Sequence, residues 1–325
     1  MLKECEFLEF DSLDFSCLID ARSPSEFSYS NLKNSINLYA LNDSQREEIG
    51  ILYSKNQSLA KLKGASYICE NMSLHLDYLY DNLKVGSLVG IYCSRGGLRS
   101  KSIALILSEI GYRVFRLKGG YKSYRSYIRE YFDNLNLKLF SLCGNSACGK
   151  SELLSLMKEK IELEKLANHF GSVFGNINGN QPSQKQFDED LFRACKNIKK
   201  FAFIELESRK IGDITIPLSL YNNMQNSFKI LCECSLNNRI ERIYKNYYSK
   251  ISYDFFISCI NKISHYISLE FKKDIINSYE KNDIYKVIEM LLSYYDKVYK
   301  KPKKIDYILN TDDLLRAKEE LINLC

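Results

Sequence analysis

The stretch Ser87-Leu88-Val89-Gly90-Ile91-Tyr92-Cys93-Ser94-Arg95-Gly96-Gly97-Leu98-Arg99 decides the fold of the first part of this chain. Residues 87–92 form an apolar run of strand length, and the two glycines that follow let the backbone curl. A helical pattern then runs from about Leu98 to Ile110. A strand that leads into a polar loop and then a helix is typical of an open α/β sheet.

The segments on either side of this stretch extend the same alternation. The patterns predict strands over Phe15–Asp20 and Arg113–Leu117, and helices over Asp43–Ser54, Ile68–Leu83 and Tyr121–Phe132. We therefore expect residues 1–134 to form one α/β domain.

A second strand and loop follow about fifty residues later. Leu137–Leu142 leads into Gly144-Asn145-Ser146-Ala147-Cys148-Gly149-Lys150-Ser151, which fits the P-loop pattern, and a helix is predicted over Ser151–Lys160. The backbone N–H groups of such a loop cradle phosphate oxygens. We expect Gly144, Gly149, Lys150 and Ser151 to bind phosphate.

Residues 135–325 are predicted to be a P-loop domain with a helical tail. A polar loop spans Gly171–Gln184, strands are expected over Phe201–Ile204 and Phe228–Glu233, and the pattern is mostly helical from Leu236, most strongly over Ile284–Tyr295.

Charged residues that follow the two later strands have two interpretations each. Glu205 and Glu207 either place an acidic group near the phosphates, as a Walker B strand does, or end a strand in solvent. Arg239 and Arg242 either reach phosphates or form surface ion pairs, and the second interpretation is favoured.

Composition bounds the class of protein. The 325 residues suffice for two domains, and the net charge of +6 permits a nucleic-acid partner without requiring one. No apolar stretch is long enough to span a membrane and the start is unlike a signal peptide, so a cytoplasmic protein is expected. The eleven cysteines are irregularly spaced. Cys232 and Cys234 have no second Cys/His pair nearby, so we expect no metal site.

Cys93 is the predicted nucleophile. A thiolate forms readily where backbone N–H groups and a helix amino terminus converge, and Arg95 and Arg99 add positive charge. Gly96 and Gly97 are expected to let the loop wrap around an oxyanion. The alternative is a buried core cysteine, as expected for most of the others.

The first domain resembles the rhodanese family. The resemblance rests on the Cys93 loop, on Ile19-Asp20-Ala21-Arg22-Ser23-Pro24-Ser25-Glu26-Phe27 and on Leu117-Lys118-Gly119-Gly120-Tyr121-Lys122. The loop has the Cys-x5-Arg spacing of cysteine phosphatases that share this fold, one residue longer than is usual in sulfurtransferases. A wider loop suits a tetrahedral phosphorus oxyanion, so our hypothesis is that it accepts a chalcogen-bearing phosphate.

The chain as a whole resembles the tRNA 2-selenouridine synthases. The matching segments are residues 163–175, 181–184, 204–212, 216–217 and 292–296. Two positions depart from the family pattern: Phe170 replaces an Arg, and Ser94 replaces a Trp. The resemblance also draws attention to Asn168, His169, Ser208 and Arg209, although His169 is interpreted first as a structural residue.

The resemblance implies a two-step change of the wobble 2-thiouridine of tRNA. Geranyl diphosphate first alkylates the thiocarbonyl sulfur, and selenium from selenophosphate then displaces the geranylated sulfur. The P-loop would hold the diphosphate, and Cys93 would present selenium. No tightly bound cofactor is implied, Mg²⁺ and the oligomeric state stay open, and a selenophosphate supplier is a candidate partner.

Two cation-rich segments are candidates for tRNA binding. They contribute Lys122, Arg125 and Arg129 from one helix, and Lys300, Lys301 and Lys303 from the segment 297–304.

Two other functions fit the same motifs. One is a tRNA sulfurtransferase that uses a Cys93 persulfide and ATP at the P-loop; the other is a non-catalytic, nucleotide-gated tRNA-binding or sulfur-carrier module. A requirement for ATP would distinguish the first from selenium transfer.

Overall fold

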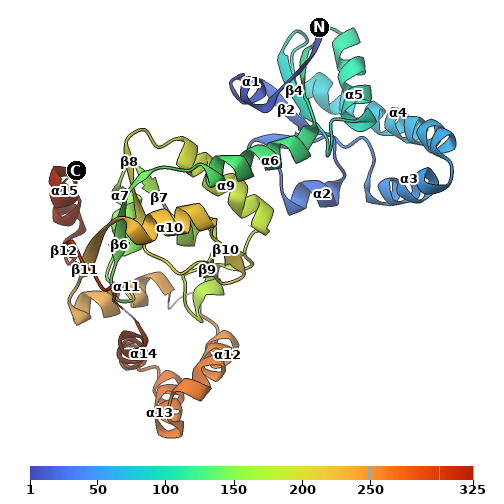
Figure 1. The fold of residues 1–325 in the computed structure, drawn as a ribbon. Helices are drawn as coiled ribbons and strands as arrows, with labels where there is room; N and C mark the ends of the chain where they lie inside the picture. Colours follow the sequence, from blue (N-terminus) through green and yellow to red (C-terminus); the bar gives the residue numbers. More distant parts are fainter. Residues whose placement is uncertain (248–250, 300, 325) are drawn as a thin grey trace. The chain divides into compact units, whose positions relative to one another are not determined.

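The computed structural model of the chain describes residues 1–247, 251–299 and 301–324. It forms two compact units, Met1–Tyr131 and Phe132–Cys325, called unit 1 and unit 2 below (Figure 1). No helix among these described residues is both long and apolar enough to cross a membrane.

Unit 1 is built on a parallel sheet of five strands in the order β1-β5-β4-β2-β3. The strands are β1 (Leu2–Cys5), β2 (Cys17–Asp20), β3 (Ser35–Asn37), β4 (Leu88–Tyr92) and β5 (Arg113–Leu117). Because β4 is the central strand and is almost entirely buried, Cys93 emerges at the middle of the carboxyl edge of the sheet.

Helices supply the rest of unit 1. They are α1 (Phe7–Asp11), α2 (Pro24–Tyr29), α3 (Asp43–Lys55), α4 (Gln57–Asn82), α5 (Leu98–Glu109) and α6 (Gly120–Asp133). Apolar side chains of α4 and α5, such as Met72 and Ile103, pack with Val89 and Ile91 of β4 in one buried core. The burial of both faces explains the continuous apolar run of β4.

Unit 2 contains a second parallel sheet of five strands, in the order β12-β11-β6-β8-β7. The strands are β6 (Lys138–Cys143), β7 (Lys160–Ile161), β8 (Phe201–Glu205), β11 (Phe228–Glu233) and β12 (Tyr307–Asn310). The short strands β9 (Lys210–Ile211) and β10 (Ile214–Thr215) form an antiparallel pair. The central strand β6 leads directly into the P-loop, as β4 leads into the Cys93 loop.

The helices of unit 2 fall into two sets. Around the sheet lie α7 (Lys150–Leu156), α8 (Leu163–Leu166), α9 (Gln184–Lys196), α10 (Leu218–Asn226), α11 (Leu236–Tyr247) and α15 (Leu314–Leu324). Figure 1 shows α12 (Tyr253–Ile263), α13 (Leu269–Glu280) and α14 (Ile284–Val298) grouped apart from the strands. Phe174, from the loop before α9, packs into the core of this group.

Most predicted elements are confirmed, and the α/β class of both domains is confirmed. The helix expected over Ser151–Lys160 is wrong at its end, because Met157 adopts an extended conformation and Lys160 pairs with β8 as an edge strand. The tail that was predicted to be mostly helical also contains the strand β12. The helix predicted to begin at Ile68 is α4, which begins at Gln57. The strand β7 is short and depends on its pairing with β8, so local propensity does not indicate it.

Two glycines give a direct test of the packing of unit 1. A Cβ atom on Gly90 in β4 would lie 2.7 Å from a ring carbon of Phe15, so Gly90→Ala should lower the free energy of unfolding by about 1–3 kcal/mol. Gly50 in α3 has open space around its Cα, so the matched change Gly50→Ala should raise it by about 0.5–1 kcal/mol. Urea denaturation measures both, and equal effects would contradict the predicted packing.

Candidate functional site

The Cys93 loop is held by the turn that precedes α6. The N–H of Tyr121 donates to the Cys93 carbonyl at 2.8 Å, and the N–H of Lys122 donates to the Ser94 carbonyl at 2.9 Å. A Cβ atom on Gly120, which has a positive φ, would lie 2.1 Å from the Cys93 carbonyl oxygen. Only glycine fits this close approach, so the Gly119-Gly120 turn is part of the loop's architecture.

A buried ion pair supports the Gly119-Gly120 turn. Arg22 is bonded to Asp20 at 2.6 Å, and both side chains are almost fully buried. The Arg22 guanidinium also lies 4.0 Å from the centre of the Tyr121 ring. The stretch from Ile19 to Phe27 thus contributes support to the Cys93 loop rather than a reacting group.

Cys93 is buried, with only 2% of the residue exposed, and it packs with the hydrophobic core of unit 1, as the alternative of a core cysteine predicts. Its Sγ accepts a hydrogen bond from Ser100 Oγ at 3.1 Å, and Ser100 is fully buried at the first turn of α5. Ser100 is thus a side-chain partner of the predicted nucleophile. Sequence reasoning missed Ser100, although its position directly after Arg99 was a signal that could have found it.

The two loop arginines differ in their surroundings. Arg99 Nη1 is bonded to Glu26 Oε2 at 2.6 Å, and Ser94 Oγ donates to Glu26 Oε1 at 2.6 Å. Burial would raise the pKa of Glu26, but Arg99 and Ser94 outweigh it and lower this pKa to about 2. Arg95 is exposed at the tip of the loop. Arg99 therefore orders the loop through Glu26, whereas Arg95 is the cation available to an incoming anion.

The glycines of the loop also have different roles. Gly96 has a positive φ, and a Cβ atom there would lie 2.9 Å from the Gly119 nitrogen. Arg116 Nη1 donates to the Gly96 carbonyl. Gly97 begins α5 and has open space around it. Gly96 is thus required by backbone packing, and Gly97 leaves room at the mouth of the loop.

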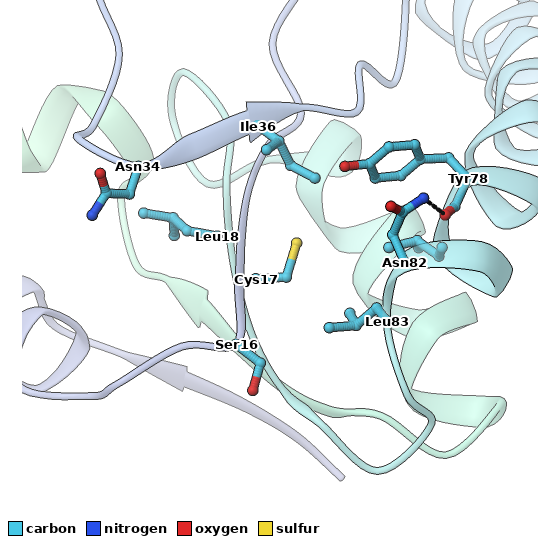
Figure 2. Close-up of a pocket in the computed structure, with 9 residues that line it drawn as sticks. Ser16, Cys17, Leu18, Asn34, Ile36, Tyr78, Asn82 and Leu83 are labelled. Atoms are coloured by element: carbon cyan, nitrogen blue, oxygen red, sulfur yellow. Dashed lines mark hydrogen bonds between the residues drawn. The ribbon is translucent and has the colours of Figure 1, made fainter.

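The cavity in Figure 2 lies at the opposite edge of the same sheet. It has a volume of about 150 Å³ and is lined by residues at the amino ends of β2 and β3, among them Cys17 and Asn34. Burial raises the pKa of the Cys17 thiol to about 11, which makes this sulfur a poor nucleophile. No Lys or Arg lines the cavity, so it is not suited to an oxyanion.

The P-loop of unit 2 wraps around its own lysine. Lys150 Nζ donates to the carbonyls of Gly144 and Asn145 at 2.8 and 3.2 Å. Ala147 and Gly149 have positive φ angles, the conformation that turns successive N–H groups toward one point. The loop is therefore formed as an anion nest in which Lys150 already lies inside.

Three carboxylates lie near Lys150. Ser151 Oγ donates to Glu164 Oε2 at 3.1 Å, and Glu205 Oε2 accepts the Leu163 N–H at 2.6 Å. Burial, reinforced by the charge of Glu164, raises the pKa of Glu207 to about 7; burial also raises the pKa of Glu164 and of Glu205. Glu205 therefore supports α8, whereas Glu164 and Glu207 form the acidic group beside the phosphate nest. Sequence reasoning missed Glu164.

The other residues suggested by sequence lie in structural settings. His169 Nδ1 accepts the Gly171 N–H at 3.1 Å, and burial lowers the pKa of His169. Asn168 Nδ2 donates to the Asn180 carbonyl at 2.9 Å, and Ser208 Oγ donates to the Lys210 carbonyl at 2.6 Å. Arg209 is exposed beside Ser208. These contacts hold the loop before α9 and the β9–β10 hairpin.

The cationic candidates are mostly exposed. Lys122 and Arg129 are exposed on α6 and Arg125 is half-buried, and the backbone of Lys122 contacts the Cys93 loop directly. Lys301 and Lys303 are exposed, and Lys300 lies outside the described residues. Within the described ranges, the structure contains no cluster of three or more His, Cys, Asp or Glu residues suited to a metal ion.

Comparison with known proteins identifies both units. A family model described as the tRNA 2-selenouridine synthase AAA domain matches residues 137–266, and the rhodanese-like domain matches residues 7–127. The tRNA 2-selenouridine synthase of Alcanivorax borkumensis is 33% identical over 75% of this chain and 69% of that protein. The enzyme of Pseudomonas syringae pv. syringae is 31% identical over 73% of this chain and 67% of that protein. The enzyme of Hydrogenovibrio crunogenus is 30% identical over 71% of this chain and 67% of that protein.

A solved structure adds a weaker likeness. It is the amino-terminal domain of an ATP/GTP-binding protein from Clostridium difficile 630, with 30% sequence identity and a TM-score of 0.35. The match covers 39% of this chain and 98% of that domain.

The Ser100 hydroxyl should control the reactivity of Cys93. Ser100→Ala removes the donor to Sγ, so alkylation of Cys93 by iodoacetamide at pH 7.5 should slow roughly tenfold, the worth of one hydrogen bond. Peptide mass analysis follows Cys93 alone among the cysteines. Ser94→Ala is the matched control, because that hydroxyl bonds to Glu26 instead of sulfur. Equal rates in the Ser100 variant and wild type would contradict the role.

The raised pKa of Glu207 predicts a pH dependence of stability. Because the folded state holds a proton that the unfolded state releases near pH 4.5, the free energy of unfolding should fall as pH rises from about 4.5 through 7. The wild type should lose on the order of 2 kcal/mol of its free energy of unfolding between pH 5 and 8, and Glu207→Gln should not show this decrease. Urea denaturation in EDTA measures this, and parallel pH profiles of variant and wild type would refute it.

Proposed function

This chain belongs to the tRNA 2-selenouridine synthase family, whose activity forms 2-selenouridine in tRNA, and we propose that its two loops divide the reaction into two steps. The substrate is the wobble 2-thiouridine of tRNA. The first step alkylates its sulfur at the P-loop of unit 2. The second replaces that sulfur with selenium at the Cys93 loop of unit 1.

In the first step the thiocarbonyl sulfur attacks C1 of geranyl diphosphate. A carbon–sulfur bond forms, the C1–oxygen bond breaks, and diphosphate leaves. Charge grows on the departing diphosphate, so a preformed nest of N–H groups and the half-buried Lys150 would stabilise the transition state. The support for this assignment is the position of the lysine, whose Nζ already lies inside the loop and donates to the Gly144 and Asn145 carbonyls at 2.8 and 3.2 Å and to Cys148 Sγ at 3.8 Å.

The residues beside the P-loop could also hold a Mg²⁺ ion together with the diphosphate. Ser151 and Glu164 offer hard oxygen donors side by side, 3.1 Å apart, of the kind that Mg²⁺ prefers. An ion bound there would neutralise charge on the leaving group. The remaining residues act without it: the loop amides orient the phosphates, and Glu207 keeps an additional proton near neutral pH.

In the second step the selenium of selenophosphate attacks C2 of the base, so a carbon–selenium bond forms and the carbon–sulfur bond to the S-geranyl group breaks. Water then cleaves the phosphorus–selenium bond, which releases phosphate and leaves selenium on the base. The order is physically reasonable, because a thiocarbonyl sulfur is a poor leaving group whereas an alkylated sulfur departs as geranyl thiol. The Cys-x5-Arg loop suits the phosphate part of selenophosphate, with Arg95 exposed at its tip. Cys93, which accepts the hydrogen bond from Ser100, would hold the selenophosphate against the base, with no change in the oxidation state of sulfur or selenium.

Binding of tRNA is assigned to cations beside each loop, all of them exposed except the half-buried Arg125. Lys122, Arg125 and Arg129 follow the Cys93 loop along α6, spaced so that they share one face of the helix. Lys301 and Lys303 follow α14 in unit 2. Such contacts to phosphates position the RNA without reading its sequence. We also assign the protein to the cytoplasm, where its substrate tRNA is found, and propose no tightly bound cofactor.

Mass analysis of nucleosides tests the order of the steps. The full chain is incubated with tRNA that carries 2-thiouridine. Geranyl diphosphate alone should give S-geranyl-2-thiouridine, selenophosphate alone should give no product, and the two together should give 2-selenouridine. Formation of 2-selenouridine without geranyl diphosphate would refute the two-step route, and a strict requirement for ATP would favour the sulfurtransferase alternative.

A further inference from the structure

The segment 297–304, rich in cations, begins inside the last turn of a helix that touches the P-loop. Lys297 belongs to α14, and Lys301 and Lys303 are exposed beyond it. The segment is anchored again just before β12, where the Lys229 N–H donates to Asp306 Oδ2 at 2.9 Å. Lys301 and Lys303 thus lie between two fixed points of unit 2.

The first fixed point is a hydrogen bond from the P-loop itself. The Gly144 N–H donates to Tyr299 Oη at 2.9 Å, and Tyr299 directly follows α14. A residue of the cation-rich segment therefore touches the first glycine of the phosphate-binding motif.

An ion pair makes a second connection between the same helix and the same loop. Arg239 Nε donates to the Ser146 carbonyl at 2.9 Å, while Nη1 and Nη2 donate to the two carboxylate oxygens of Asp296 at 2.8 and 2.6 Å. The Asp296 side chain is 32% exposed, so the ion pair favoured by sequence reasoning forms, although its Arg239 side is buried. Its fork geometry fixes the carbonyl and the carboxylate at once.

Asp296 and Tyr299 are three residues apart and so lie on one side of the helix end. One contact restrains a P-loop N–H and the other restrains a P-loop carbonyl two residues later. The conformation of the loop between Gly144 and Ser146 and the position of the α14 end are consequently determined together.

We propose that the end of α14 couples the P-loop to RNA bound by Lys301 and Lys303, with Tyr299 and the Arg239–Asp296 pair as positioning residues. This inference rests on the proposed function, which assigns diphosphate to the P-loop and RNA to Lys301 and Lys303. RNA bound to these lysines also restrains Tyr299 and Asp296. The P-loop is then already partly ordered, so it loses less conformational entropy when it binds diphosphate. By linkage, diphosphate strengthens RNA binding by the same factor.

Calorimetric titration of the full chain with inorganic pyrophosphate tests the coupling. The Kd is measured alone and with a saturating anticodon stem-loop RNA that contains 2-thiouridine. In the wild type the RNA should lower the Kd about fivefold, a typical size for coupling between sites. Tyr299→Phe removes only the hydroxyl and should reduce this factor to near one, and Arg239→Lys, which loses the fork, should do the same.

Tyr285→Phe is the matched control. It removes another tyrosine hydroxyl from α14, one that donates to Glu241 at 3.0 Å instead of contacting the P-loop. The control should keep the fivefold factor, and thermal unfolding without ligand should be alike in the Tyr285 and Tyr299 variants. A merely structural role for Tyr299 would lower its melting temperature and leave the factor intact.

The outcomes separate the two levels of the proposal. If the wild type binds pyrophosphate and RNA but the factor is one, or if Tyr299→Phe and Arg239→Lys keep the wild-type factor, the coupling is refuted and the proposed function stands. If the wild type binds no pyrophosphate, the assignment of diphosphate to the P-loop fails and the coupling fails with it.

Discussion

Both functional loops depend on donors from elsewhere in the fold that engage their carbonyl oxygens. A loop can offer its N–H groups to an anion only if its carbonyls point away and are satisfied. In unit 1 this is done by the backbone of Tyr121 and Lys122 and by Arg116. In unit 2 Arg239 and Thr311 donate to the carbonyls of Ser146 and Cys148, while the loop's own Lys150 donates to those of Gly144 and Asn145.

This constraint explains why residues without chemical roles matter in each unit. Gly120 must lack a Cβ so that α6 can bring its first N–H groups to the Cys93 loop, and Arg22 stacks on Tyr121 to hold that helix start. The P-loop is likewise surrounded by residues from the last third of the chain. Each site is thus preorganised before a ligand arrives, which is the condition under which electrostatic stabilisation is effective.

The sequence predicts those features that local pattern determines. The strands β4 and β6, the glycines after them, Cys93 and Lys150 follow from apolar runs and loop motifs, and the family follows from segments spread along the chain. Most partners of the loops could not be predicted, because they reach the loops through tertiary structure. Glu164 accepts a hydrogen bond from Ser151, and Tyr299 accepts one from Gly144, only after helices pack and β7 joins the sheet edge. Ser100 differs, because it directly follows Arg99 in the sequence.

The central claim is that Cys93 serves the selenium step and the P-loop the alkylation step. Single-turnover conversion of RNA that already carries S-geranyl-2-thiouridine, with selenophosphate as the other substrate, tests it most directly. Cys93→Ser should slow this conversion at least a hundredfold, on the order of 3 kcal/mol, while Lys150→Ala should stay within about threefold of wild type. A Cys93→Ser protein that converts the RNA at the wild-type rate would contradict the account.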